Sequence, residues 1–223
     1  MSRRYFVTGT DTEVGKTAVS CALLHAAGAL GLRTAAVKPV AAGCDEQGRN
    51  EDALALQAAM NMPLPYEQIN PVALQPAIAP HIAAAQAGKR LQVERLAGLC
   101  RGVFASGADL VLVEGAGGWR VPLGPRETLA DLAVALGSDV ILVVGMRLGC
   151  INHALLTAEA IRADGLQLAG WVANQVGERM ACHEENVDTL RQLLPAPLLG
   201  ELPHLMPFDP EKAAQYIDIK ALL

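Results

Sequence analysis

The sequence has no excess of basic residues, and those present form no stripe along the chain. Its 223 residues include 18 Lys and Arg against 23 Asp and Glu, which gives a formal net charge of −5 at pH 7. Binding to a nucleic-acid backbone depends on clustered cations that neutralise the phosphates. We therefore expect no nucleic-acid partner.

Long apolar runs are also missing. The opening residues, "MSRRYFVTG", reach a polar loop after an apolar stretch that is too short for a signal peptide. No stretch approaches the roughly 18 apolar residues that a membrane span needs. We expect a cytoplasmic protein with no membrane partner.

The five cysteines are scattered, at positions 21, 44, 100, 150 and 182, with no CxxC spacing. Their odd number in a reducing compartment predicts free thiols. The adjacent pair Cys182 and His183 is too little to indicate a metal site.

Aromatic residues make up only 4% of a chain that is 52% hydrophobic, and Ala, Leu and Val supply most of its apolar side chains. Short apolar runs alternate with longer segments of helical period. This alternation predicts an α/β fold in a single domain over residues 1–223, with a parallel sheet covered by helices on both faces.

The expected strands span residues 4–8, 34–38, 109–114, 139–145 and 168–174, and a sixth candidate spans 197–202. The expected helices span residues 16–30, 52–60, 80–87, 93–105, 128–136, 152–164 and 181–193. Segment 61–80 carries five prolines and is predicted to be a long surface loop. Because ligands of open parallel sheets bind beyond the carboxyl ends of the strands, we expect the site there.

Residues 6–17, "FVTGTDTEVGKT", combine a strand end, a loop and a helix start. The usual phosphate-loop pattern is Gly, four residues and then Gly-Lys-Ser/Thr, but the first glycine here stands one position early, at Gly9. The context still favours phosphate binding by backbone N–H groups, with Lys16 reaching the β- and γ-phosphates and Thr17 binding Mg²⁺. The alternative is an ordinary strand-turn-helix with a chance Gly-Lys-Thr.

Two charged residues end predicted strands beside this loop. Lys38 would place a second cation against a transferring phosphoryl group, or it is a solvated lysine at a strand end. Glu114 would be a further Mg²⁺ ligand, followed by a turn in which Gly115, Gly117 and Gly118 allow close approach of the backbone. The alternative for Glu114 is a helix-capping acid in a tight turn.

Two helix starts leave more than one interpretation open. Asp52 is either an N-terminal capping acid or a third ligand of the Mg²⁺ site. Gly149 to Asn152 lie where free backbone N–H groups suit a carboxylate, although Asn152 is an equally natural N-cap. His153 is interpreted as a packed helical histidine rather than a base.

Six segments resemble the dethiobiotin synthetase family: "YFVTGTDTEVGKT", "KPVAAG", "DALALQ", "LVEGAGGW", "LGCINHALLTAE" and "AGWVANQV". The resemblance runs from residue 2 to residue 223, and the early glycine of the phosphate loop is the family's own form. It implies a P-loop NTPase-like homodimer that joins CO₂ to 7,8-diaminononanoate with ATP and Mg²⁺. A carbamate would form on one amine and attack the γ-phosphate, and the second amine would displace phosphate from the resulting anhydride to close a cyclic urea.

The resemblance also implies roles for individual residues. Lys16, Lys38 and Thr12 would act on the reacting groups, and Thr17, Asp52 and Glu114 would hold Mg²⁺. The nucleotide would lie against Glu13, Val14, Gly15, Lys16, Thr17, Ala18, Gly115, Ala116, Gly117, Asn174, Gln175, Pro203, His204, Leu205 and Glu211. The diamine would contact Thr12, Lys38, Ala42, Gly117, Gly118 and, across the dimer interface, Gly149, Cys150, Ile151 and Asn152.

One position departs from the family's pattern, and two rival classes fit less well. The family usually has Ser or Thr where Ala42 stands, so one contact with the diamine is expected to be missing or replaced by a water. Partitioning and septum-site ATPases, which bind partners under nucleotide control, carry a lysine where Asp11 stands. Amidating ligases of cofactor synthesis generally carry a glutamine-hydrolysing domain, for which this chain has no room.

Overall fold

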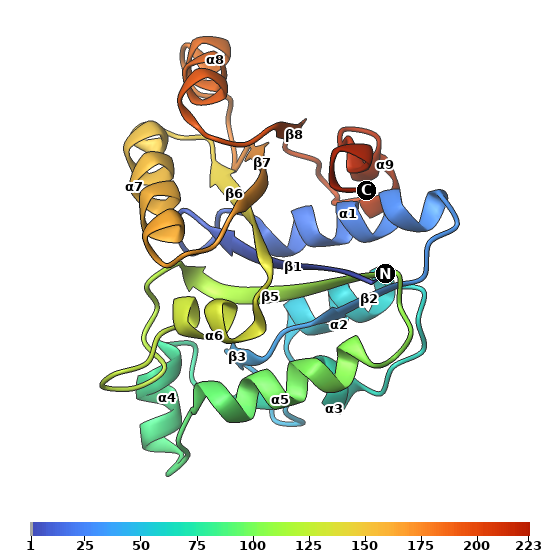
Figure 1. Cartoon of the computed structure of the whole chain (residues 1–223), viewed down its shortest axis with the longest axis vertical. Coiled ribbons are helices and arrows are strands. Elements are labelled where there is room, and N and C mark those ends of the chain that lie inside the picture. Colours follow the sequence, from blue (N-terminus) through green and yellow to red (C-terminus); the bar gives the residue numbers. More distant parts are fainter. Residues whose placement is uncertain (1) are drawn as a thin grey trace.

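A parallel sheet forms the centre of the protein in the computed structural model, which describes residues 2–223 (Figure 1). Within this range the sheet has six strands in the order β2-β5-β1-β6-β7-β8, and each neighbouring pair is parallel. The α/β fold and the sixth candidate strand are confirmed. The strands are β1 (Arg3–Gly9), β2 (Thr34–Val37), β5 (Leu110–Gly118), β6 (Asp139–Gly145), β7 (Leu168–Asn174) and β8 (Leu198–Leu202).

Helices lie around the sheet, and each predicted helix is present with ends that differ by two residues or fewer. The buried run Leu110 to Val113 of β5 has no exposed surface, as expected for a strand covered on both faces. The helices are α1 (Lys16–Ala29), α2 (Glu51–Ala59), α3 (Tyr66–Ile69), α4 (Pro80–Gln86), α5 (Val93–Phe104), α6 (Leu129–Leu136), α7 (Cys150–Ala163), α8 (His183–Leu193), α9 (Pro210–Ala214) and the 3-10 helix η1 (Ile219–Leu222).

The direction of the chain across the sheet reverses beside β1. From β1 the chain crosses through α1 to β2 at one edge, whereas from β5 it crosses through α6 to β6 on the opposite side of β1. Right-handed crossovers therefore place α1 and α6 on opposite faces. A crevice forms where two such connections diverge, beyond the carboxyl end of β1.

Segment 61–80 is not the long surface loop that its prolines indicated. It contains α3 and the short strand β4 (Val72–Leu74), which pairs in parallel with β3 (Val40–Ala42) in a second, two-stranded sheet. Ile69 and Leu74 are buried, with 0% and 2% of their surfaces exposed. The prediction was wrong because this pairing joins residues about thirty positions apart, and local turn signals do not report such pairing.

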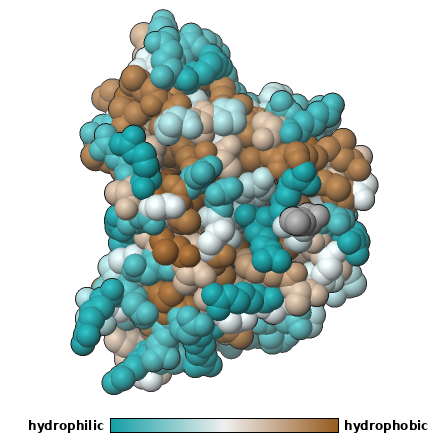
Figure 2. All heavy atoms as spheres, viewed as in Figure 1, coloured by the Kyte–Doolittle hydropathy of each residue, from teal (hydrophilic) through white to brown (hydrophobic). Residues whose placement is uncertain are grey.

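The surface in Figure 2 is hydrophilic over much of its outline, with apolar residues gathered near α7 and α8. Leu148, just before α7, has 94% of its surface exposed, and Leu156 within α7 has 56%. All five cysteines are free thiols, as predicted. Among residues 2–223, none of the helices has the length and apolar content that crossing a membrane requires.

Candidate active site

The loop between β1 and α1 has the form of a phosphate site. Gly15 is the N-cap of α1 and has a left-handed backbone with φ of +84°. A Cβ at this position would lie 2.1 Å from Nδ2 of Asn174, so glycine is required by backbone conformation and by space. Lys16 folds back over the loop, and its Nζ donates to the carbonyl oxygen of Asp11 at 3.1 Å. The first N–H groups of α1 lack partners within the helix and can donate hydrogen bonds to an anion.

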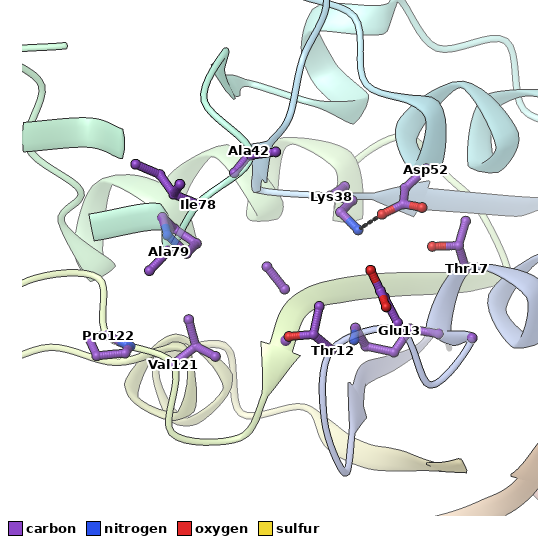
Figure 3. A pocket seen from close by; sticks show the side chains of 16 residues that line it. Thr12, Glu13, Thr17, Lys38, Ala42, Asp52, Ile78, Ala79, Val121 and Pro122 are labelled. Atoms are coloured by element: carbon purple, nitrogen blue, oxygen red, sulfur yellow. Dashed lines mark hydrogen bonds and ion pairs between the residues drawn. The ribbon is translucent and has the colours of Figure 1, made fainter. Parts of the chain in front are cut away.

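Four predicted residues, Thr17, Lys38, Asp52 and Glu114, meet next to this loop. Figure 3 shows three of them, Thr17, Lys38 and Asp52. Lys38, directly after β2, donates to Oε1 of Glu114 at 2.8 Å and to Oδ2 of Asp52. The hydroxyl of Thr17 in α1 donates to the same Oε1 of Glu114 at 2.8 Å. The end of β2, the middle of β5 and the starts of α1 and α2 therefore bring one ammonium, two carboxylates and one hydroxyl together.

These contacts exclude one alternative for each of Lys38, Glu114 and Asp52 that the sequence left open. Lys38 is 4% exposed, so it is not a solvated lysine at a strand end. Glu114 is fully buried inside β5, which continues to Gly118, so neither the glycine turn nor the capping role holds. Asp52 does not cap α2, because the side chain of Asn50 accepts the capping bond from the N–H of Ala53.

Opposite charges favour the ionised forms of Lys38 and Asp52 despite their burial. Burial alone would lower the pKa of Lys38, but the carboxylates of Glu114 and Asp52 outweigh it and raise that pKa. Burial would raise the pKa of Asp52, yet the neighbouring Lys38 lowers it. Lys16 has a pKa below the ordinary value, chiefly because it is desolvated. The site therefore presents a charged Lys38 bound by carboxylates.

Sequence reasoning missed Ser20, a fully buried residue of α1. Its hydroxyl donates to Oε2 of Glu114 at 2.7 Å. Ser20 comes one helical turn after Thr17, so the two hydroxyls share a face of α1 and each donates to a different oxygen of the carboxylate. The signal available in the sequence was a hydroxyl three residues after Thr17, in a helix that is mostly apolar beyond that threonine.

A cavity of about 700 Å³ opens beside the charged cluster. Its polar side carries Lys16, Thr17, Lys38 and Asp52, and its other side is apolar. Figure 3 shows Ala42, Ile78 and Ala79 on one apolar wall, with Val121 and Pro122 facing them. The wall residues Ala77, Ile78, Ala79, Pro80, Val121 and Pro122 were not among the predicted site residues. The arrangement suits a ligand that has both an anionic or polar end and a hydrocarbon part.

Most of the other predicted nucleotide residues line a smaller recess of about 280 Å³ next to the phosphate loop. Asn174, at the end of β7, donates from Nδ2 to the carbonyl oxygen of Val14 at 2.8 Å and so fixes this side of the loop. Glu211 does not reach the recess and instead lines a groove along α1 and α9. The predicted residues in the recess are Glu13, Gly15, Ala18, Asn174, Gln175, Pro203, His204 and Leu205.

The remaining predicted residues lie in the phosphate loop, at the end of β3, along β5 and at the start of α7. Thr12, Glu13, Ala42, Ala116 and Gly117 line the main cavity. Gly117 has φ of +64°, and a Cβ there would lie 2.8 Å from Cγ2 of Val121. Gly115 and Gly118 flank this stretch within β5, and Val14 is buried under the loop.

The start of α7 lies outside both cavities of this chain. Gly149 is its N-cap, so Asn152 lies within the helix and is not a cap. Cys150 is buried and Ile151 is partly buried, whereas Asn152 is exposed. His153 is also exposed, and its interpretation as a packed histidine was wrong.

Solved structures with this fold are P-loop NTPases. The septum site-determining protein MinD of Pyrococcus horikoshii, solved with Mg-ADP, matches with a TM-score of 0.59 and 17% identity over 100% of this chain and 95% of its own. A ParA family ATPase of Chlorobium tepidum matches with a TM-score of 0.59 and 12% identity over 100% and 99%. At these identities the likeness shows the fold alone, and together with the loop geometry it places the chain in the P-loop NTPase class.

Sequence relatives identify the family within that class. The chain is 58% identical to the ATP-dependent dethiobiotin synthetase of Cellvibrio japonicus, over 100% of this chain and 99% of that protein. It is also 58% identical to the enzyme of the same name from Pseudomonas paraeruginosa, over 98% and 97%. A family model described as an AAA domain matches residues 3–212. The chain belongs to the ATP-dependent dethiobiotin synthetases, the ligases that close a ring with ATP in biotin biosynthesis.

Proposed function

We propose that this chain joins CO₂ to both amines of 7,8-diaminononanoate and closes the cyclic urea of dethiobiotin, with ATP converted to ADP and phosphate. The observation that carries the proposal is the single cavity in which Lys16, Lys38 and the phosphate loop face an apolar wall. Such a cavity can hold a triphosphate and an alkyl chain side by side. Positioning of the two would supply much of the rate enhancement.

In the proposed reaction, one neutral amine of the diamine first adds CO₂, loses a proton and becomes a carbamate. A carbamate oxygen then attacks the γ-phosphorus, and ADP leaves, which gives a carbamic-phosphoric anhydride. The second amine attacks the carbonyl carbon, loses a proton and displaces phosphate. Lys16 and Lys38 would stabilise the charge on the transferring phosphoryl group, and Thr12, which lines the same cavity, would contact the carbamate.

The donors around Glu114 suit Mg²⁺. The hydroxyl of Thr17 and the carboxylates of Asp52 and Glu114 converge on one cluster, and hard oxygen donors of this kind are those that Mg²⁺ takes in proteins. Bound there with a nucleotide, Mg²⁺ would neutralise charge on the phosphates. The same carboxylates hold Lys38, so that ammonium already lies beside the proposed metal ligands.

Nucleotide recognition is proposed for the smaller recess. The phosphate loop connects the two cavities, because Glu13 and Gly15 line both of them. Asn174, Gln175, Pro203, His204 and Leu205 would face the adenine and ribose. Glu211 remains a proposed contact of the nucleotide, although it lies in a different groove of this chain.

We infer that the working form is a homodimer of single-domain chains, each spanning residues 1–223, in the cytoplasm and with small-molecule substrates alone. The start of α7, from Gly149 to Asn152, lies outside the cavity of its own chain. Leu148 and Leu156 expose large apolar surfaces beside it, and burial of such groups favours association. In the dimer this helix start would bind the substrate carboxylate in the partner's cavity.

The reaction is tested with purified protein, MgATP, bicarbonate and 7,8-diaminononanoate, by measuring phosphate release and the mass of the cyclic-urea product. Equal amounts of both, dependent on the diamine, are expected. Phosphate release that ignores the diamine, with no urea formed, would overturn the proposal and favour a nucleotide-switched, partner-binding ATPase, to which the chain has only a distant structural relation.

A further inference from the structure

Two polar side chains, those of Asn70 and Tyr66, connect the backbone of Lys38 to the backbone at the start of α2. Nδ2 of Asn70 donates to the carbonyl oxygen of Lys38 at 2.8 Å, and Oδ1 of Asn70 accepts from the hydroxyl of Tyr66 at 3.3 Å. That hydroxyl in turn accepts from the backbone N–H of Asn50 at 2.8 Å. Asn50 is the N-cap of α2, the helix whose first turn carries Asp52.

The same chain of contacts reaches the wall of the cavity. Nδ2 of Asn50 donates to the carbonyl oxygen of Ala42 at 3.3 Å, and Ala42 lines the cavity. The N–H of Lys38 donates to the carbonyl oxygen of Ile69 at 2.7 Å, so both backbone groups of Lys38 are held by the segment that contains Tyr66. Asn50 and Asn70 are 7% and 4% exposed, so their bonds are shielded from water.

We propose that Tyr66, together with Asn50 and Asn70, positions Lys38 relative to Asp52 for phosphoryl transfer. The inference rests on the proposed function. Lys38 and Asp52 lie on different elements, and the hydroxyl of Tyr66 bridges the residue that holds Lys38 and the residue that caps the helix of Asp52. Tyr66 contacts neither reacting group and is a positioning residue, whose loss would change where the ammonium of Lys38 stands.

The test is Tyr66→Phe, which removes the hydroxyl and keeps the ring. The guanidinium of Arg49 lies 5.3 Å from the centre of that ring, and this contact survives the change. We expect kcat to fall about tenfold, because small misplacements of reacting groups are costly. The KM for ATP should change less than about twofold, because the phosphate loop is untouched.

Tyr5→Phe is the matched control. The hydroxyl of Tyr5 donates to the carbonyl oxygen of Leu222 at 2.7 Å, and neither residue lines the cavity. Its removal should lower Tm and leave kcat unchanged. Tyr66→Phe should also be made in a Lys38→Ala background, where an effect that acts through Lys38 should shrink to less than about twofold.

An unchanged kcat in Tyr66→Phe, or an equal fall in kcat with and without Lys38, would overturn the inference and leave Tyr66 a structural residue. Asn70→Ser, which breaks the same link and leaves Tyr66 in place, should reproduce the kcat effect if Tyr66→Phe folds poorly. Failure of the proposed function is distinguishable, because the unaltered protein would then form no urea.

Discussion

Removal of the Lys38 ammonium tests the charged cluster directly. In Lys38→Ala the carboxylate of Glu114, which has no exposed surface, keeps the hydroxyl donors of Thr17 and Ser20 but loses its cation. Loss of one partner from a buried ion pair costs about 3–5 kcal/mol. Because the two hydroxyls remain, we expect the low end, about 3 kcal/mol. Loss of the ion pair with Asp52 adds little to this cost in stability, because the Asp52 side chain is 45% exposed.

Thermal unfolding measures this loss. For a chain of this length 1 kcal/mol corresponds to about 2–4 °C, so Tm in EDTA should fall by about 6–12 °C. Turnover of the diamine should fall at least about a hundredfold, because Lys38 would no longer stabilise the transferring phosphoryl group. Both quantities come from one protein preparation.

The matched control is Lys212→Ala. Its ammonium lies 3.4 Å from Asp209, and its side chain is 71% exposed, so Tm should change by less than about 2 °C. If the Tm of Lys38→Ala differs from that of the unaltered protein by no more than the Tm of this control does, the argument that Lys38 offsets the cost of burying the Glu114 carboxylate is refuted. Near-normal turnover would remove Lys38 from the catalytic residues.

Three further predictions concern the metal site, the substrate and acid stability. Glu114→Gln should raise the Mg²⁺ concentration needed for half-maximal rate, and an unchanged titration would argue against a role in metal binding. Ala42→Ser should lower the KM of the diamine by the equivalent of about 0.5–1.5 kcal/mol, the usual worth of one hydrogen bond; a KM that stays the same or rises would show that the missing hydroxyl is already replaced. Hydrogen bonds from Arg33 hold the pKa of Asp109 at about 2, below its ordinary 3.8. The ionised Asp109 therefore stabilises the folded protein fully above pH 3.8, and this stabilisation is lost as the pH falls toward 2. The difference in Tm between Asp109→Asn and the unaltered protein should shrink over that range. A constant difference would contradict the assignment.

Periodicity and buried apolar runs predicted the main sheet and its helices well. Leu110 to Val113 lie in a strand covered on both faces, and such a run is apolar at every position. Helix starts were harder to place where the cap was unusual. Gly149 and not Asn152 caps α7, because its left-handed backbone lets the chain turn into the helix two residues earlier than predicted.

Segment 61–80 shows where local reasoning fails. Its prolines are real turn signals, but Asn70 and Ile69 bind the backbone of Lys38, and β4 pairs with β3. Further along the segment, Ile78 contributes to the apolar wall of the cavity. These contacts depend on which distant segment lies alongside, and composition carries no information on that.

The sequence by itself determined the phosphate loop, the alternation of strands and helices, and the family. Each of these depends on residues that are neighbours in the chain, so local conformation expresses them directly. Only the tertiary structure decided that Lys38 lies between Asp52 and Glu114, that Ser20 completes the bonding of Glu114, and that Tyr66 links Lys38 to α2. The bonds of Lys38 and Glu114 to side chains join residues 14 to 97 positions apart, and they form only when the parallel sheet brings β2, β5 and the helices beside them together.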